Sequence, residues 1–235
     1  VLDRSGSMRG NKLASVKEAA KQIVSGLNPG ERFNIITYNE GVNLFEAAPV
    51  EKNGASEKAA HAWLDAVVAR GGTNMHEALA AALSQPSHEG MLPVVLFLTD
   101  GLPTIGRTSE KSIAALAGEG NRAERRIFTI GVGEDVNAPL LRRMAEISGG
   151  LPCYILSGEN LEVKLSQVFR QLYGPVFRKV RYTVCSPDGR EQPGRVQDAI
   201  PSGVLPDIYS GNPAVLAGRY IGTEPFPVSY THLRA

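Results

Sequence analysis

PVVLFLTDG, residues 93–101, is an almost continuous apolar run that ends abruptly in Thr99, Asp100 and Gly101. A strand that is apolar along both faces is typical of a parallel sheet covered by helices on both sides. The chain opens in the same way, because Val1 and Leu2 are followed at once by Asp3. Two buried strands that each end in an aspartate predict a sheet with one polar edge.

Helical and strand patterns alternate on both sides of this run. Residues with the 3.6-residue period of amphipathic helices are found at 11–27, 55–69, 75–83, 112–117, 138–147 and 161–172, and further strands are expected at 33–38, 126–133 and 153–156. The alternation predicts an α/β fold with a doubly wound, mostly parallel central sheet and helices on both faces. In such sheets, sites form beyond the carboxyl ends of the strands, where Asp3 and Asp100 are expected.

The pattern changes after residue 173. Short alternating runs at 180–184 and 214–220, separated by the turns SPDG and SGNP, predict a small β-rich segment over 174–228 that is an incomplete module. The last residues, SYTHLRA at 229–235, do not continue this alternation and resemble translated sequencing-adapter tails. We therefore expect a first domain over 1–173, with a truncated first strand, and a disordered, non-native tail over 229–235.

Composition excludes several classes of function. Lys and Arg number 25 against 24 Asp and Glu, a net charge of +1, so no basic field is available for nucleic acid or an anionic membrane. No apolar stretch reaches the roughly 18 to 20 residues that span a bilayer. Cys153 and Cys185 lack metal-site spacing and are expected to be ordinary thiols. The chain lacks an initiator Met and reads as a fragment, so targeting signals are expected upstream.

The opening residues VLDRSGSM carry the clearest chemistry. Asp3, Ser5 and Ser7 offer hard oxygen donors at alternate positions, and Gly6 lets the backbone turn around a point. Hard divalent cations bind oxygen ligands, and three protein oxygens are too few for a full shell. Thr73, in the loop RGGTN, and Asp100 are the candidates to complete it. Five small ligands, two of them carboxylates, favour Mg²⁺ or Mn²⁺ over Ca²⁺.

Each of these segments also has an ordinary structural interpretation. The serines can cap the helix that follows them, and Thr73 can cap the helix that starts near residue 75. Asp100 can form a turn with Gly101. His76 lies at the end of the RGGTN loop, but imidazole is not the ligand of a hard oxygen site, so a helix-surface role is expected.

The sequence carries none of the common catalytic motifs. The P-loop pattern fails in the segment from Gly6 to Leu13, since its spacing and its last residue are wrong. An aspartyl-phosphate hydrolase would carry a second acid two residues after Asp3, where Ser5 stands. Neither a Ser/His/Asp set nor a dinucleotide fingerprint is identifiable. The chain is therefore expected not to be an enzyme, with a metal-dependent hydrolase as the least favoured alternative.

VLDRSGSM, RGGTNMHEAL and FLTDG together resemble the three loops of the von Willebrand factor type A domain, over about residues 1–173. The resemblance implies a Rossmann-like fold and a metal-ion-dependent adhesion site. It implies that Ser5, Ser7 and Thr73 supply hydroxyl ligands to Mg²⁺ (or Mn²⁺ or Ca²⁺), with Asp3 and Asp100 bound directly or through water. An Asp or Glu carboxylate of a partner protein would complete the octahedron.

The β-rich segment resembles a narrower group. GPVFRKVRYTV and GVLPDIYSGNPAVLAGRY look like the segments after the A domain in proteins similar to the inter-alpha-trypsin-inhibitor heavy chains, bacterial relatives included. This implies an adhesion module that is secreted or lies in the cell envelope. The alternative is an intracellular A domain acting in an AAA-type ATPase complex.

Overall fold

The computed structural model describes residues 1–159, 163, 164, 168, 175–201, 205, 207–209, 213–223 and 227–234. The chain divides into two compact units, Val1–Phe169 and Arg170–Ala235. That each unit is a separate domain, with a boundary at residue 173, stays a prediction. The helix expected at 161–172 lies outside the described residues except at positions 163, 164 and 168.

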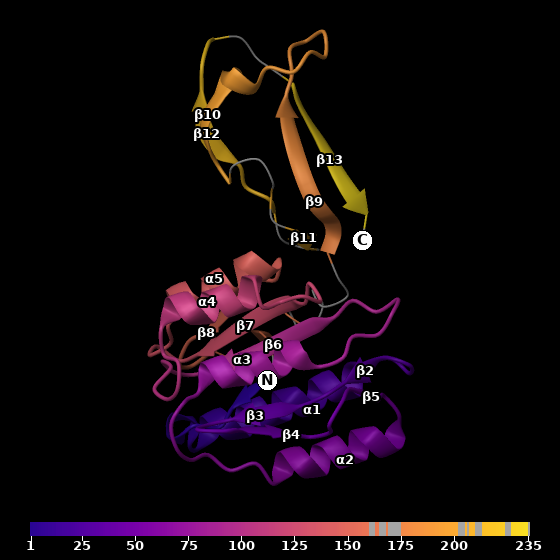
Figure 1. Cartoon of the computed structure of the whole chain (residues 1–235), viewed down its shortest axis with the longest axis vertical. Helices are drawn as coiled ribbons and strands as arrows, with labels where there is room; N and C mark the ends of the chain where they lie inside the picture. Colours follow the sequence, from indigo (N-terminus) through magenta and orange to yellow (C-terminus); the bar gives the residue numbers. More distant parts are fainter. Residues whose placement is uncertain are drawn as a thin grey trace. The chain divides into compact units, whose positions relative to one another are not determined.

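The first unit is built on a six-stranded sheet (Figure 1). Its strands, in spatial order, are β4 (Val42–Leu44), β3 (Ile36–Tyr38), β1 (Leu2–Asp3), β6 (Val94–Thr99), β7 (Arg126–Val132) and β8 (Pro152–Ile155). All neighbours pair in parallel except β4, which runs antiparallel to β3 at the edge. The predicted doubly wound, mostly parallel sheet is confirmed.

Five helices lie in the part of the first unit that the structure describes. They are α1 (Asn11–Gly26), α2 (Gly54–Asp65), α3 (Met75–Ser84), α4 (Glu110–Gly118) and α5 (Ala138–Ser148). On one face, α4 packs between α3 and α5, and their apolar side chains form one cluster with Val95 and Phe97 of β6. Successive strand residues point to opposite faces, so Leu98 faces the other side. There the buried side chains of α1, such as Val16, cover the sheet.

Two predicted elements differ from the structure. The strand expected at 33–38 is two strands, β2 (Arg32–Phe33) and β3, and β2 pairs with β5 (Val50–Glu51) in a separate small sheet. The interruption follows from Asn34, whose side-chain oxygen accepts the backbone N–H of Ile35 and so replaces a ladder bond. The helix expected at 55–69 ends at Asp65, before the β-branched pair Val67 and Val68.

The second unit is entirely β-structure and one short 3₁₀ turn, as far as it is described. The strand β9 (Pro175–Val184) pairs antiparallel with β11 (Ile208–Tyr209) and β13 (Val228–Arg234), while β10 (Val196–Ile200) pairs with β12 (Ala217–Tyr220). The expectation of a disordered tail is wrong for residues 229–234, which form most of β13. Main-chain bonds to β9 and residues of high β-propensity, such as Tyr230, are enough to order a strand. That the tail is non-native stays a prediction.

The described residues bear on two expectations from composition, which concern membrane-spanning segments and the two cysteines. None of the helices in the described part of the chain is long and apolar enough to cross a membrane. Cys153, in β8, and Cys185, directly after β9, are both free and half-buried. Burial raises the pKa of the Cys153 thiol, which makes the thiolate less available.

Candidate metal centre

Asp3 ends the short central strand β1 and is completely buried. It lies opposite Tyr38 of β3, and its carboxylate is held from both neighbouring strands: Thr99 donates to Oδ2 at 2.7 Å and Tyr38 donates at 3.3 Å. The backbone N–H of Ser5 donates to Oδ1 at 2.8 Å. Burial raises the pKa of Asp3, hydrogen bonds from Thr99 and Ser5 lower it, and Asp100 raises it, with a net rise. Although strand β1 is only two residues long, these three hydrogen bonds fix the position of the Asp3 carboxylate.

The serine loop brings its hydroxyls to the third loop. After Ser5 the chain forms one 3₁₀ turn, η1 (Gly6–Met8), which the fully buried Met8 anchors in the core. Ser5 Oγ lies 3.0 Å from Ser7 Oγ, and Ser7 Oγ donates to Asp100 Oδ1 at 2.8 Å. Three of the five predicted ligands therefore form one continuous chain of side-chain oxygens.

Thr73 is placed beside this chain by the backbone. Gly6 N–H donates to Gly71 C=O at 2.9 Å, and Arg70 N–H donates to Arg4 C=O at 2.8 Å, so the RGGT loop runs alongside the serine loop. Thr73 itself is only 4% exposed. Its position follows from these loop contacts and not from a bond to the other four candidates.

The loop after β6 holds the RGGT loop from the other side. Thr73 N–H donates to the hydroxyl of Thr104 at 2.9 Å, and Thr104 N–H donates back to Thr73 C=O at 2.9 Å. A Cβ on Gly72 would lie 2.5 Å from Cγ1 of Ile105, so only glycine fits at this close approach. The three motif loops thus form one packed unit at the carboxyl edge of the sheet.

The capping interpretations of these residues are wrong. The N-cap of α1 is Gly10, and neither serine caps that helix. The N-cap of α3 is Asn74, whose side-chain oxygen accepts the N–H of Glu77, so Thr73 is not a cap. Both carboxylate oxygens of Asp100 bind side chains, which a simple turn former would not require. None of the hydroxyls of Ser5, Ser7 and Thr73 is therefore used to cap α1 or α3.

The sequence patterns did not indicate that Lys12, in the first turn of α1, belongs to the candidate site. Its ammonium lies 2.9 Å from Asp100 Oδ2, and the Asp100 side chain is 0% exposed while that of Lys12 is 37% exposed. Asp100 thus points Oδ1 at Ser7 and Oδ2 at Lys12. The signal available in the sequence was a lysine one helical turn after the serine loop, where it can reach the strand ends.

The donor set fits a small hard cation. Within the described residues, no group of three or more His, Cys, Asp or Glu could hold a metal, so a site here must use hydroxyls beside its two carboxylates. The oxygen separations of 3.0 and 2.8 Å match the roughly 2.9 Å between adjacent ligands of an octahedral ion with bonds of about 2.0–2.1 Å. His76 lies on α3, and burial and Arg107 lower its pKa.

Comparisons with known proteins identify the family of the first unit. Residues 1–152 match the family model of the von Willebrand factor type A domain. The chain is 26% identical to inter-alpha-trypsin inhibitor heavy chain H4 of Bos taurus over 233 residues, 96% of this chain and 25% of that protein. The chain therefore spans about a quarter of the length of the curated relatives it matches.

Solved structures share the fold. The von Willebrand factor type A protein of Catenulispora acidiphila superposes with a TM-score of 0.72 at 20% identity, covering 100% of this chain and 61% of that one. Proximal thread matrix protein 1 of the mussel byssus, with a zinc-occupied MIDAS motif, superposes with a TM-score of 0.56 at 21% identity, covering 72% and 43%. With the family model matched over most of its length, the chain belongs to the von Willebrand factor type A domain family.

Proposed function

We propose that the chain is a divalent-cation-dependent protein-binding module of the adhesion type. Asp3, Ser5, Ser7, Thr73 and Asp100 would hold Mg²⁺, or Mn²⁺ or Ca²⁺ in its place. The observation that carries the proposal is the oxygen chain from Ser5 through Ser7 to Asp100, beside the buried carboxylate of Asp3. The zinc-occupied MIDAS motif of the mussel protein, a structural relative, supports it.

Charge balance indicates what the site would bind. The two carboxylates contribute two negative charges and Lys12 one positive charge, while Ser5, Ser7 and Thr73 are neutral. A divalent cation would leave the site with a net positive charge. When bound, the cation supplies an electrophilic position, and a carboxylate is the protein group that best fills it. Since Ser7 is exposed, an Asp or Glu of a partner protein can approach from that side.

Catalysis is not part of the proposal. A cation beside Asp3 and Asp100 would stabilise both carboxylates in their ionised form, so neither could act as a general acid near neutral pH. By similarity to the inter-alpha-trypsin inhibitor heavy chains, we propose that the module is secreted or lies in the cell envelope. No observation favours the alternative of an intracellular ATPase complex or that of a hydrolase.

Calorimetric titration with Mg²⁺ tests the cation site. The wild-type protein should bind one Mg²⁺, and Asp100→Ala should bind none that is detectable. The matched control is Asp135→Ala, because Asp135 follows β7 at the same edge of the sheet but is exposed and outside the oxygen chain. Unchanged Mg²⁺ affinity in Asp100→Ala would refute the assignment.

A further inference from the structure

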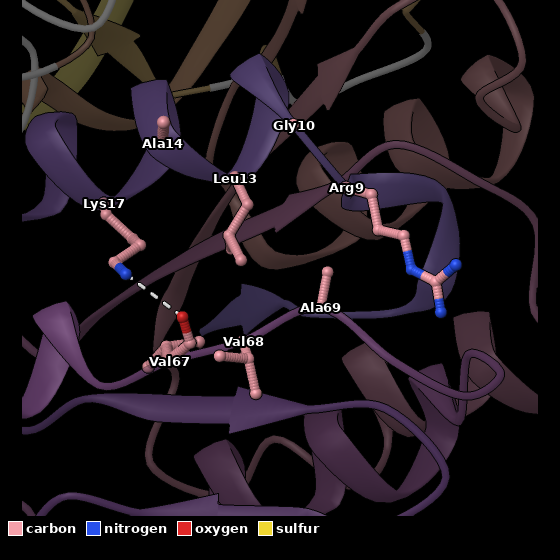
Figure 2. A pocket seen from close by; sticks show the side chains of 8 residues that line it. All are labelled: Arg9, Gly10, Leu13, Ala14, Lys17, Val67, Val68 and Ala69. Atoms are coloured by element: carbon pink, nitrogen blue, oxygen red, sulfur yellow. Dashed lines mark hydrogen bonds between the residues drawn. The ribbon is translucent and has the colours of Figure 1, made fainter.

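A shallow groove lies beside the candidate metal centre, between the start of α1 and the segment that follows α2. Its volume is about 270 Å³. Figure 2 shows Leu13 of α1 opposite Val68 and Ala69, with Arg9 at one end of the groove and Lys17 at the other. The groove thus has an apolar middle between two cationic side chains.

Some of the apolar side chains that line the groove are exposed and are not part of the hydrophobic core. Val68 is 60% exposed, although a β-branched side chain in a packed domain usually contributes to burial. Ala14, on the facing wall formed by α1, is also exposed, whereas Leu13 beside it is 8% exposed. Neighbouring exposed apolar side chains in a concave surface are typical of a recognition site.

The charges of the groove define what would complement it. No acidic residue lines it. The ammonium of Lys17 is already used, because it donates to the backbone carbonyls of Asp65 at 2.7 Å and Val67 at 3.0 Å. The guanidinium of Arg9 is exposed and has no ion pair among the described residues. An aliphatic side chain followed or preceded by an acidic one would satisfy both parts of this surface.

Both walls of the groove are close in sequence to the candidate metal ligands. Arg9 is two residues from Ser7, and Ala69 is four residues from Thr73. At a maximum of about 3.3–3.6 Å per residue, these separations are at most about 7 and 14 Å. An extended peptide covers about 3.3 Å per residue, so residues one to three positions from a metal-bound acid would reach the groove.

We propose that this groove is the specificity subsite of the module. It holds an aliphatic side chain located one to three residues from the metal-bound Asp or Glu in an extended segment of a partner protein, and Arg9 pairs with a second acidic residue of that segment. The inference rests on the proposed function, since it names the kind of segment that the same centre recognises.

Peptide binding tests this proposal. The probes are biotinylated Gly-Ser peptides with one central Asp, displayed at high density, and the same peptides with Leu one, two or three residues from the Asp. With Mg²⁺, the wild-type protein should bind one of the Leu peptides about five- to thirtyfold more tightly than the parent peptide, as expected for partial burial of an aliphatic side chain. EDTA should abolish all binding.

Variants separate the groove from the cation site. Val68→Ser should reduce the preference for Leu to less than about twofold while the parent peptide binds as before; Val215→Ser, at a position 71% exposed in the second unit, should retain the preference. A Glu placed next to the Leu of the best peptide should tighten binding to the wild-type protein, and Arg9→Gln should lose only that gain. An undiminished preference in Val68→Ser overturns the groove assignment alone. Absence of any Mg²⁺-dependent binding overturns the proposed function and this inference together.

Discussion

Replacing Lys12 with Met tests whether the ammonium of Lys12 offsets the charge of the buried Asp100 carboxylate when no cation is bound. The side chains are similar in length, but the substitution removes the ammonium that lies 2.9 Å from Asp100 Oδ2. Without a cation, the variant would keep two buried carboxylates, Asp3 and Asp100, and lose the positive charge that offsets one of them. We expect Lys12→Met to destabilise the cation-free protein and to strengthen cation binding.

The expected loss of stability depends on how deeply the Lys12–Asp100 ion pair is buried. Removing one partner of a fully buried ion pair costs about 3–5 kcal/mol, whereas exposed pairs contribute about 0–1 kcal/mol. Here Asp100 is 0% exposed and Lys12 is 37% exposed, so we expect an intermediate loss of about 1–3 kcal/mol in the free energy of unfolding. For a chain of this size that lowers the melting temperature by about 2–12 °C.

Cation binding should change in the opposite direction. An ammonium and a divalent ion at opposite oxygens of one carboxylate would be about 6 Å apart, and even with the dielectric constant of water their repulsion is about 1.4 kcal/mol. Mg²⁺ should therefore bind Lys12→Met about tenfold more tightly than the wild-type protein.

Thermal denaturation in EDTA and in saturating Mg²⁺ measures both effects. The variant should melt below the wild-type protein in EDTA, and Mg²⁺ should narrow or close the gap. Lys17→Met is the matched control, because Lys17 is also on α1 but binds only backbone carbonyls. Its loss of stability should be the same with and without Mg²⁺. A Lys12→Met protein that melts like the wild type in EDTA, or gains nothing from Mg²⁺, would show that the charge of Lys12 does not offset that of Asp100.

Three further predictions concern single contacts. Ser7→Ala should weaken Mg²⁺ binding in calorimetry by about tenfold and cost about 1–2 kcal/mol of stability without Mg²⁺, because the buried Asp100 loses its 2.8 Å donor; an unchanged Mg²⁺ affinity would show that Ser7 is not a ligand. Thr99→Val should lower the free energy of unfolding, measured by urea denaturation, by about 1–3 kcal/mol, because the buried Asp3 loses its 2.7 Å donor. An unchanged midpoint would contradict this. Truncation after Val228 removes β13 from β9 and should lower the stability of the second unit, measured by circular dichroism, whereas an unaffected transition would favour a dispensable tail.

The sheet was predictable because its strands can be recognised from their own residues. The run at 93–101 is apolar on both faces, and the strand β6 occupies Val94–Thr99 within it. Asp3 and Asp100 were expected at the carboxyl edge on topology alone, and the structure places them there. Two expectations failed: Asn34 interrupts a strand through its own side chain, and β13 forms by backbone pairing with β9, a long-range contact that alternation in the tail did not indicate.

The surroundings of the candidate site were less predictable than its members. Motif spacing predicted the five candidate oxygen donors, but it could not indicate that the Asp100 side chain is fully buried or that Lys12 pairs with it. Nor could it indicate that Thr99 and Tyr38 hold Asp3. These contacts join residues far apart in the sequence, so they depend on strand register, which a single sequence specifies poorly.

Anomalous diffraction from a crystal grown with Mn²⁺ tests the central claim most directly, because manganese scatters anomalously and takes the same oxygen ligands as Mg²⁺. We expect one strong peak in the first unit, about 2.0–2.3 Å from Ser5 Oγ and Ser7 Oγ, with Thr73, Asp3 and Asp100 bound directly or through water. A crystal without a peak among these five side chains, or with its peak on other residues, would contradict the proposed metal site.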